Sequence, residues 1–356
     1  MRIGAITGTL HHLKHEWRAS NKGKVIVANQ EDLSENYLEQ MLRRGVKAVV
    51  NGQTSMTGHF DHRGVQRLLE AGIPVFDVKS SNGLMNLHQG RKARITNHTL
   101  YMRDAYGVWK PAASLTGYDH ERVERLKQRA ASLRSNTFKD FYRNSTDEAN
   151  KQLSTFLKLM TQAGATAIGN RPLLIVAPTS NVERVLLYTK RYFKRIKPFI
   201  IAVDTACRKV YRAGLKPDVI LGDFTYVDEQ DLTSDSLLVI PTTPEEKHHA
   251  SVTKLQRLQL SYTTCSGFGG LEETAILYAR SVSNGTIFML GSGTNMEEAM
   301  GQGRSEIGVQ ALMHLWFGSE IVDVKGVSKF MDPSINPHKL DWLATRRTTS
   351  GADGWL

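Results

Sequence analysis

Residues 216–229, KPDVILGDFTYVDE, contain the stretch that decides the fold. An apolar run from Val219 to Leu221 continues past Gly222 to Phe224 and then gives way to polar residues. Such a run is typical of a buried parallel strand that brings a carboxylate to the edge of an α/β sheet. Ligands bind at that edge, so Asp223, at the end of the run, raises the question of a metal site.

Five further apolar runs in the same half of the chain predict strands with helices between them. They are LLIVA at 173–177, PFIIAVD at 198–204, SLLVIP at 236–241, TIFMLG at 286–291 and EIVDVKG at 320–326. Strands that are apolar on both faces need helices on both sides, which predicts a doubly wound α/β sheet.

The first 118 residues predict a smaller α/β domain. Three short apolar runs predict strands that alternate with helical segments: KVIVAN at 24–29, VKAVVNG at 46–52 and IPVFDV at 73–78. This alternation favours a parallel sheet. Residues 88–102 predict a turn and a short strand pair that closes the domain. From residue 119 to 168 the pattern is charged and helix-forming, with interruptions near Asn136 and Asn144, and predicts one or two long linking helices that are also candidates for a homodimer contact.

The composition is that of an ordinary globular protein, with 40% hydrophobic and 23% charged residues in 356. No stretch approaches the roughly 18 apolar residues of a membrane span, and the first residues lack a signal-peptide core, so we expect a cytoplasmic protein. Cys207 and Cys265 form neither a disulfide framework nor a metal knuckle, in keeping with a reducing compartment. We expect no activated thiolate at either position.

The formal charge of +11 fits a nucleic acid, an anionic lipid or a phosphate-rich ligand. Basic residues concentrate at 190–197, in a helical pattern without an RNA- or DNA-binding motif. We favour a solvated helix face there and do not expect a nucleic-acid partner. The alternative, nucleic-acid binding through residues 184–197, predicts an affinity that falls steeply with salt and survives Asp223→Ala.

Polar residues at the predicted strand ends indicate one ligand-binding crevice. Acids, a glycine turn (GSGTN, 291–295) and an arginine in one place suit a phosphate ligand with Mg²⁺. Simpler interpretations stay open, because strand-end aspartates cap loops and glutamates at a helix start pair with its dipole. The residues expected to bind a nucleotide or phosphate are Asp204, Asp218, Gly222, Gly291, Ser292, Gly293, Thr294, Arg304 and Ser305, and those expected to hold a metal are Asp223, Glu272 and Glu273.

The segment PFIIAVDTACRKVYRAGLKPDVILGDF, residues 198–224, resembles the nucleotide-binding half of thiamine pyrophosphokinases. The whole chain resembles the SteA-type cytokinetic-ring proteins of Gram-positive bacteria, which carry this kinase-like domain. Four segments match blocks of that family in order: GVKAVVNGQTSMTGHF, LLEAGIPVFDV, GTNMEEAMGQGRSE and IVDVKGVSKF. The resemblance covers roughly residues 24–331. The predicted divisions are an N-terminal α/β domain at 1–118, a helical linker at 119–168, a thiamine pyrophosphokinase-like nucleotide-binding domain at 169–332 and a flexible tail at 333–356.

The departures from the kinase pattern argue against catalysis. In the kinases a second aspartate follows two residues after the first and helps to hold Mg²⁺, whereas here Thr225 stands at that position and Tyr226 replaces the serine. The aspartate-glycine-glycine turn has become Asp204-Thr205-Ala206, while Glu272 and Glu273 lie where the family has an acidic pair. The residues after Phe330 are too few for the β-sandwich that completes the thiamine pocket, and they contain no membrane span of the kind that many SteA-type proteins carry.

The resemblance therefore implies a SteA-like cell-division or septum-associated protein whose kinase-like domain binds a nucleotide such as ATP, or another phosphate ligand, without efficient catalysis. A septal or membrane partner protein would recruit it. The alternative is an active diphosphotransferase that transfers diphosphate from ATP to thiamine or a related alcohol with Mg²⁺. The first domain, with NGQTSMTGHF, then LLEAGIPVFDV, then LHQGRKARIT, also resembles the swivelling phosphohistidine domains of phosphoenolpyruvate-using enzymes. Met56 stands at the histidine position of those domains, and we interpret His59 as a loop residue rather than a phosphoryl carrier.

Overall fold

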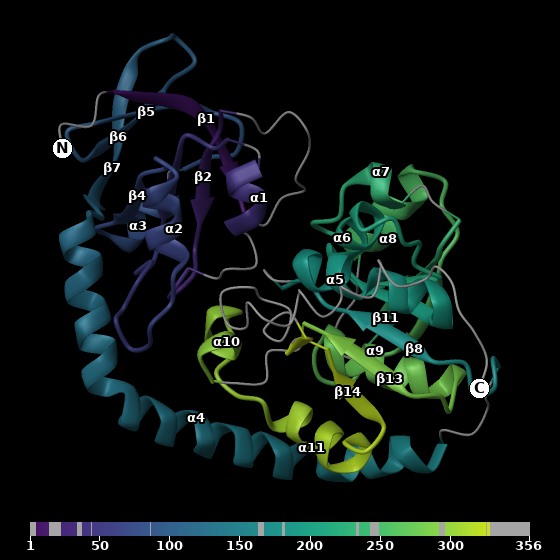
Figure 1. The fold of residues 1–356 in the computed structure, drawn as a ribbon. Helices are drawn as coiled ribbons and strands as arrows, with labels where there is room; N and C mark the ends of the chain where they lie inside the picture. The colour runs from purple at the N-terminus through teal and green to yellow at the C-terminus, as the bar shows by residue number, and fades with distance from the viewer. Residues whose placement is uncertain are drawn as a thin grey trace, which may run out of the picture. The chain divides into compact units, whose positions relative to one another are not determined.

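The computed structural model describes residues 5–13, 23–33, 38–43, 45–85, 87–162, 167–179, 182–232, 235–242, 249–291, 296–324 and 326–327. The chain is mixed α/β, as predicted (Figure 1). It divides into two compact units: unit 1 comprises residues 1–154 and 293–311, and unit 2 comprises residues 155–292 and 312–356. The division differs from the consecutive segments expected from the sequence, because residues 293–311 return to unit 1.

Unit 1 is built on a closed barrel with the strand order β1-β2-β3-β4-β7-β6-β5. Strands β1 to β4 pair in parallel, and the remaining neighbours pair antiparallel. The three predicted parallel strands and the predicted strand pair are confirmed, but closure of the sheet was not predicted. The strands are β1 (Ile6–His12), β2 (Val25–Ala28), β3 (Ala48–Asn51), β4 (Val75–Val78), β5 (Lys92–Thr96), β6 (Thr99–Arg103) and β7 (Trp109–Gly117).

The barrel interior is filled by the alternate side chains of its strands, among them Val25, Val27, Val50 and Phe76. The outside of the parallel half carries short helices, of which α2 buries Val65 and Leu68. Parallel strands need such crossover helices, and these cover the apolar outward residues of β2 and β3. The crossover helices are α1 (Leu38–Arg43) and α2 (Gly64–Glu70), whereas α3 (Ser81–Met85) follows β4 and packs Leu84 against the barrel interior.

A single helix, α4 (His120–Gln162), belongs to both units. The interruptions expected near Asn136 and Asn144 do not occur. Directly after Asn144, the Ser145 hydroxyl donates to the Phe141 carbonyl one turn earlier in the helix, so this weak helix former satisfies its polar group without breaking it. In unit 2 the buried Phe156 ring of α4 contacts Phe268 and Trp316.

Residues 293–311 join unit 1 through contacts with α4. Arg134 forms an ion pair with Glu297 at 2.8 Å, and the amide of Ile307 donates to Ser145 Oγ at 3.0 Å. These contacts link positions about 160 apart in the sequence, which no local pattern reveals. The segment contains α10 (Met296–Gly301) and the start of α11 (Gly308–Phe317).

Unit 2 contains a seven-stranded sheet in the order β12-β11-β10-β9-β8-β13-β14, in which every neighbouring pair is parallel. All six predicted strands are present, and β12 was not predicted. The strands are β8 (Leu173–Val176), β9 (Phe199–Val203), β10 (Val219–Leu221), β11 (Leu237–Thr242), β12 (Thr263–Ser266), β13 (Ile287–Leu290) and β14 (Ile321–Asp323). The helices are α5 (Val182–Ile196), α6 (Ala206–Arg212), α7 (Glu229–Leu232), α8 (His249–Arg257) and α9 (Leu271–Val282).

Both faces of the central strands are buried, as their unbroken apolar pattern requires. On one face, strand residues such as Leu174 and Ile220 share a core with buried residues of α5 and α6. The opposite face carries Ile175 and Ile201, which are also fully buried, and α9 contacts β8 and β9. The basic residues from Lys190 to Arg195 form the last part of α5, which buries Val185 and Phe193 and exposes Arg191, and Lys197 follows the helix with a φ of 47°.

Candidate functional site

The strand order of unit 2 reverses between β8 and β13. The chain passes from β8 to β9 on one side and from β13 to β14 on the other. In open parallel sheets, ligands bind at the carboxyl ends of the strands beside such a reversal. Gly291 directly follows β13 there with φ +99°, and a Cβ at this position would lie 2.8 Å from Thr179 Oγ1 and 2.9 Å from the Ala177 carbonyl oxygen. Glycine is therefore required where the two loops meet.

Two acids lie together at the same edge of the sheet. Asp204 follows β9 and is buried, and Asp223 follows the neighbouring strand β10. Asp204 Oδ1 accepts a hydrogen bond of 3.1 Å from the Phe224 amide, and a Cβ on Gly222 would approach that oxygen to 2.8 Å. Burial and the nearby Asp223 carboxylate raise the pKa of Asp204 to about 7. The predicted pair of strand-end acids is thus brought together.

The backbone around these acids is held in an unusual conformation. Asp204 and Phe224 both have positive φ, at 47° and 58°. Residues with a Cβ adopt this region only at an energetic disadvantage, and such strain is concentrated at functional sites. In this conformation the Asp204 carboxylate meets the loop that follows β10, where it accepts from the Phe224 amide.

Two buried lysines at this edge were missed by the sequence reasoning. Lys254 of α8 donates to the carbonyls of Phe224 and Val227 at 2.8 and 2.6 Å, and its charge counteracts the rise in the pKa of Asp204. Lys209 of α6 donates to the Thr179 carbonyl at 2.5 Å. The sequence could have indicated both lysines, because each one falls among the apolar residues on one side of a helical segment. A charged residue at such a position is buried and needs hydrogen-bond partners.

The other predicted nucleotide-binding residues lie elsewhere or outside the described part of the chain. Asp218 precedes β10, so it lies at the amino ends of the strands, where its Oδ2 accepts from the Ile200 amide at 2.8 Å. Its assignment to the crevice is wrong for this reason. Arg304 and Ser305 belong to unit 1, where Ser305 accepts from Asn144 of α4. Ser292, Gly293 and Thr294 lie outside the described residues.

The two glutamates do not join the aspartates in a metal cluster. Glu273 is buried and accepts from the Gly270 amide at 2.9 Å, so it caps the start of α9. Glu272 lies beside it in the first turn of the same helix. In the described part of the chain, no three His, Cys, Asp or Glu side chains gather as metal ligands. The proposed metal set of Asp223, Glu272 and Glu273 therefore does not form as a group.

The two cysteines have environments that disfavour the thiolate. Burial raises the pKa of Cys207, which is fully buried against the sheet, and raises that of the half-buried Cys265 to about 11. Thiolates are the reactive form of cysteine. The expectation that neither thiol is activated agrees with these environments.

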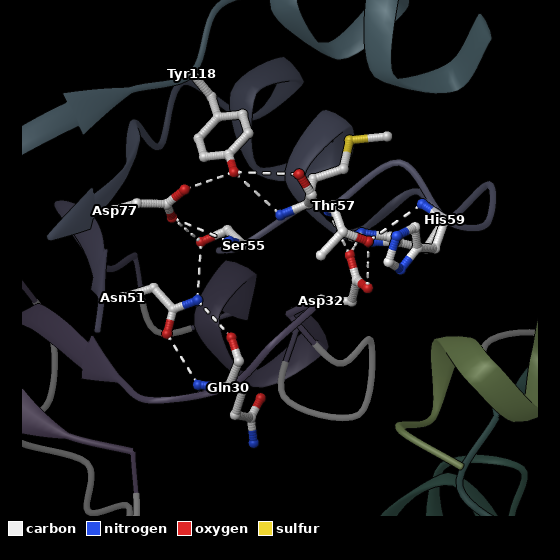
Figure 2. Close-up of polar contacts among 10 residues, drawn as sticks. Gln30, Asp32, Asn51, Ser55, Thr57, His59, Asp77 and Tyr118 are labelled. Atoms are coloured by element: carbon white, nitrogen blue, oxygen red, sulfur yellow. Dashed lines mark hydrogen bonds and ion pairs between the residues drawn. The ribbon is translucent and has the colours of Figure 1, made fainter. Parts of the chain in front are cut away.

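Unit 1 has a second polar cluster, at the carboxyl ends of its parallel strands (Figure 2). Asp77 of β4 accepts from Ser55 Oγ at 2.7 Å and from the Tyr118 hydroxyl at 2.6 Å. Asn51, the last residue of β3, donates to Ser55 Oγ at 3.1 Å and to the Gln30 carbonyl at 2.7 Å. Burial is the main cause that raises the pKa of Asp77. These groups satisfy one another, which indicates that the cluster fixes the loop containing Ser55.

The next turn of that loop is held by Asp32. Its carboxylate accepts from the Thr57 amide and hydroxyl at 2.6 and 2.7 Å and lies 3.4 Å from Nε2 of the buried His62. Burial raises the pKa of Asp32, but the nearby His62 ring and the hydrogen bonds from Thr57 outweigh it and leave the pKa below its ordinary value. His59 is exposed, and its carbonyl accepts from Thr137 of α4 at 2.8 Å, which fits a loop residue.

We expect Tyr118→Phe to destabilise unit 1 by about 2 kcal/mol, because it removes a hydrogen-bond donor from the buried Asp77 carboxylate. Urea unfolding at neutral pH measures the loss, and hydrogen exchange at the Met56 amide, which donates to the same hydroxyl, locates it. Tyr106→Phe is the control, since that ring is 92% exposed, and it should change stability by less than about 0.5 kcal/mol. Equal effects of the two variants would contradict a structural role for the cluster.

Comparison of the chain with protein-family models finds no match, and comparison with curated proteins finds no significant one. Among the described residues, no helix is both long enough and apolar enough to cross a membrane.

Proposed function

We propose that unit 2 is a doubly wound, thiamine pyrophosphokinase-like domain that binds a nucleotide, or another phosphate-bearing ligand, at the carboxyl edge of its sheet. The observation that carries this proposal is the pair Asp204 and Asp223, on neighbouring strands, with the pKa of Asp204 raised to about 7. Two acids that repel each other in a buried site are stabilised by a cation between them. The reversal of strand order beside Gly291 supports a ligand at the same edge.

The acids suit a Mg²⁺ ion that is shared with phosphates. Mg²⁺ is usually held by one or two carboxylates, with substrate phosphates and water completing its shell. Asp204 and Asp223 are the residues that would hold it, and the ion would neutralise charge on the phosphates. Lys209 and Lys254 bring two further positive charges to this edge.

The same residues favour binding over efficient catalysis. Thr225 stands where the kinases that the chain resembles have a second metal-binding aspartate, and its amide donates to Asp223 Oδ1 at 2.8 Å. One carboxylate oxygen of Asp223 is therefore already engaged, and a neutral side chain replaces the second acid. The second candidate, a diphosphotransferase acting on thiamine or a related alcohol, predicts conversion of ATP to AMP that depends on Mg²⁺ and an acceptor alcohol.

We further propose a SteA-like role in cell division or at the septum, to which a partner protein recruits the chain. The ligand would regulate assembly by binding more tightly to one arrangement of the two units than to another, since only differential affinity shifts such an equilibrium. This role rests on the sequence resemblance and on the ligand site together.

Isothermal titration with ATP, with and without Mg²⁺, tests the ligand site. We expect binding that requires Mg²⁺ and that weakens at least tenfold in Asp223→Asn, because the cation loses one of its two carboxylates. Asp218→Asn is the matched control, since it removes an acid from the opposite end of the same strand and should leave affinity unchanged. Binding that is equal in wild type and Asp223→Asn, or absent in both, would exclude a nucleotide site at this edge.

A further inference from the structure

The outward face of the β5–β6–β7 ribbon in unit 1 combines basic and aromatic side chains. Along β5 and β6, Ala93, Ile95 and Leu100 point into the barrel core. Because side chains alternate along a strand, Arg94 and Tyr101 point outward. Figure 1 shows this ribbon at one end of the barrel. The face belongs to unit 1, whereas the candidate nucleotide site and the basic helix α5 belong to unit 2.

The strand register places these outward residues side by side. Arg94 is paired with Tyr101 across β5 and β6, and Arg103 is paired with Trp109 across β6 and β7. The Arg94 guanidinium lies over the Trp109 ring, 4.6 Å from its centroid. Tyr101 and Arg103 are two residues apart, which corresponds to about 6.6 Å along the strand. Rings and guanidinium groups therefore form one contiguous surface.

The charge of this surface is positive. Lys92, Arg94 and Arg103 are exposed on it. The nearby acid in the turn after β6, Asp104, accepts from the amides of Tyr106 and Val108 and pairs with Lys110 at 3.1 Å, so it is occupied locally. The turn itself presents the Tyr106 ring, 92% exposed, at the end of the row. A partner that carries negative charges and planar rings complements this positive charge and these aromatic side chains.

Although no nucleic-acid partner is expected from the sequence, we propose that this face binds single-stranded nucleic acid. Aromatic rings on an open sheet stack with bases, and interleaved arginines hold the phosphates and stack as well. Tyr101 and Trp109 follow the ribbon toward the turn that carries the exposed Tyr106, which suits an extended strand. Each ring on the strands has a basic group beside it, so the face favours stacking on a charged surface over insertion of an apolar tip into a bilayer.

Fluorescence anisotropy of a labelled oligo-deoxythymidine of about 15 nucleotides, titrated with the whole chain, tests the proposal. We expect binding that weakens steeply as salt rises, because phosphate contacts release counterions. The double variant Arg94→Glu/Arg103→Glu should lose at least tenfold in affinity and show a shallower salt dependence. Tyr101→Leu should lose affinity about fivefold with an unchanged salt dependence, because it removes stacking but no charge.

The matched control is Lys139→Glu/Arg143→Glu, which makes the same charge change on exposed positions of α4 in unit 1. It should bind as the wild type does. Equal weakening in both double variants, or no binding at low salt, would overturn the proposal. So would binding to vesicles that contain phosphatidylserine, without binding to the oligonucleotide, since that result would assign the face to a lipid surface. Asp223→Asn should leave oligonucleotide binding unchanged, which separates this test from that of the nucleotide site.

Discussion

Asp204→Asn should make unit 2 more stable at pH 8 and leave its stability nearly unchanged at pH 4. Burial and the Asp223 charge raise the pKa of Asp204 from 3.8 to about 7, so the folded state retains a proton that the unfolded state has lost. Stability falls with rising pH wherever the folded state binds more protons, which places the loss between pH 3.8 and about 7. Asparagine has no charge to desolvate, so the variant does not lose this stability as the pH rises.

The gain at pH 8 should lie between about 1 and 4 kcal/mol, the upper figure being the full pKa difference converted at about 1.4 kcal/mol per unit. Asparagine is the right substitution because it keeps the acceptor for the Phe224 amide and tolerates the positive φ of 47°. Urea unfolding of both proteins between pH 4 and pH 8 gives the difference, and hydrogen exchange in β9 and β10 assigns it to unit 2. A difference that does not depend on pH would contradict a raised pKa at Asp204.

Asp235→Asn serves as the control for this series. Asp235 is fully solvated apart from its contact with Lys216, which lowers its pKa. Its removal should leave stability at pH 8 nearly unchanged. A gain as large as that of Asp204→Asn would point to the net charge of the chain instead of the buried carboxyl.

The sequence predicted the strand ends of unit 2 well because that information is local. An apolar run followed by an aspartate placed Asp204 and Asp223 at the same edge, and parallel pairing of β9 with β10 brings them together. The error at Asp218 follows from the same logic, since an acid before a strand lies at the opposite end from an acid after it. The buried lysines were missed because they stand apart from the basic cluster at 190–197, the one group of basic residues that was weighed.

The features of unit 1 that escaped prediction depend on distant pairings. The barrel closes because β1 pairs with β5, so that Ile6 meets Ile95, and nothing in either short segment indicates the other. Residues 293–311 join unit 1 through α4 for the same reason. The basic and aromatic face of the ribbon likewise exists only after β5, β6 and β7 align, because Arg94 and Trp109 are fifteen positions apart in the chain.

Lys254→Met should destabilise unit 2 by about 3 kcal/mol at pH 8 and by less at pH 4. The substitution keeps a long apolar stem but removes the donor to the buried carbonyls of Phe224 and Val227, at both pH values. At pH 8 it also removes the positive charge that counteracts the raised pKa of Asp204, and a buried charge is left without that compensation.

The coupling between Lys254 and Asp204 is measured by combining the two variants. At pH 8, Lys254→Met should be less harmful in the Asp204→Asn background, because no carboxylate remains there to lose its counter-charge. At pH 4, where Asp204 holds its proton, the two effects should add. Lys216→Met, at an exposed ion pair, is the control and should change stability by less than about 0.5 kcal/mol. If Lys254→Met has the same effect in both backgrounds at pH 8, the lysine acts only by holding the loop after β10, and the charges at this edge of the sheet are uncoupled.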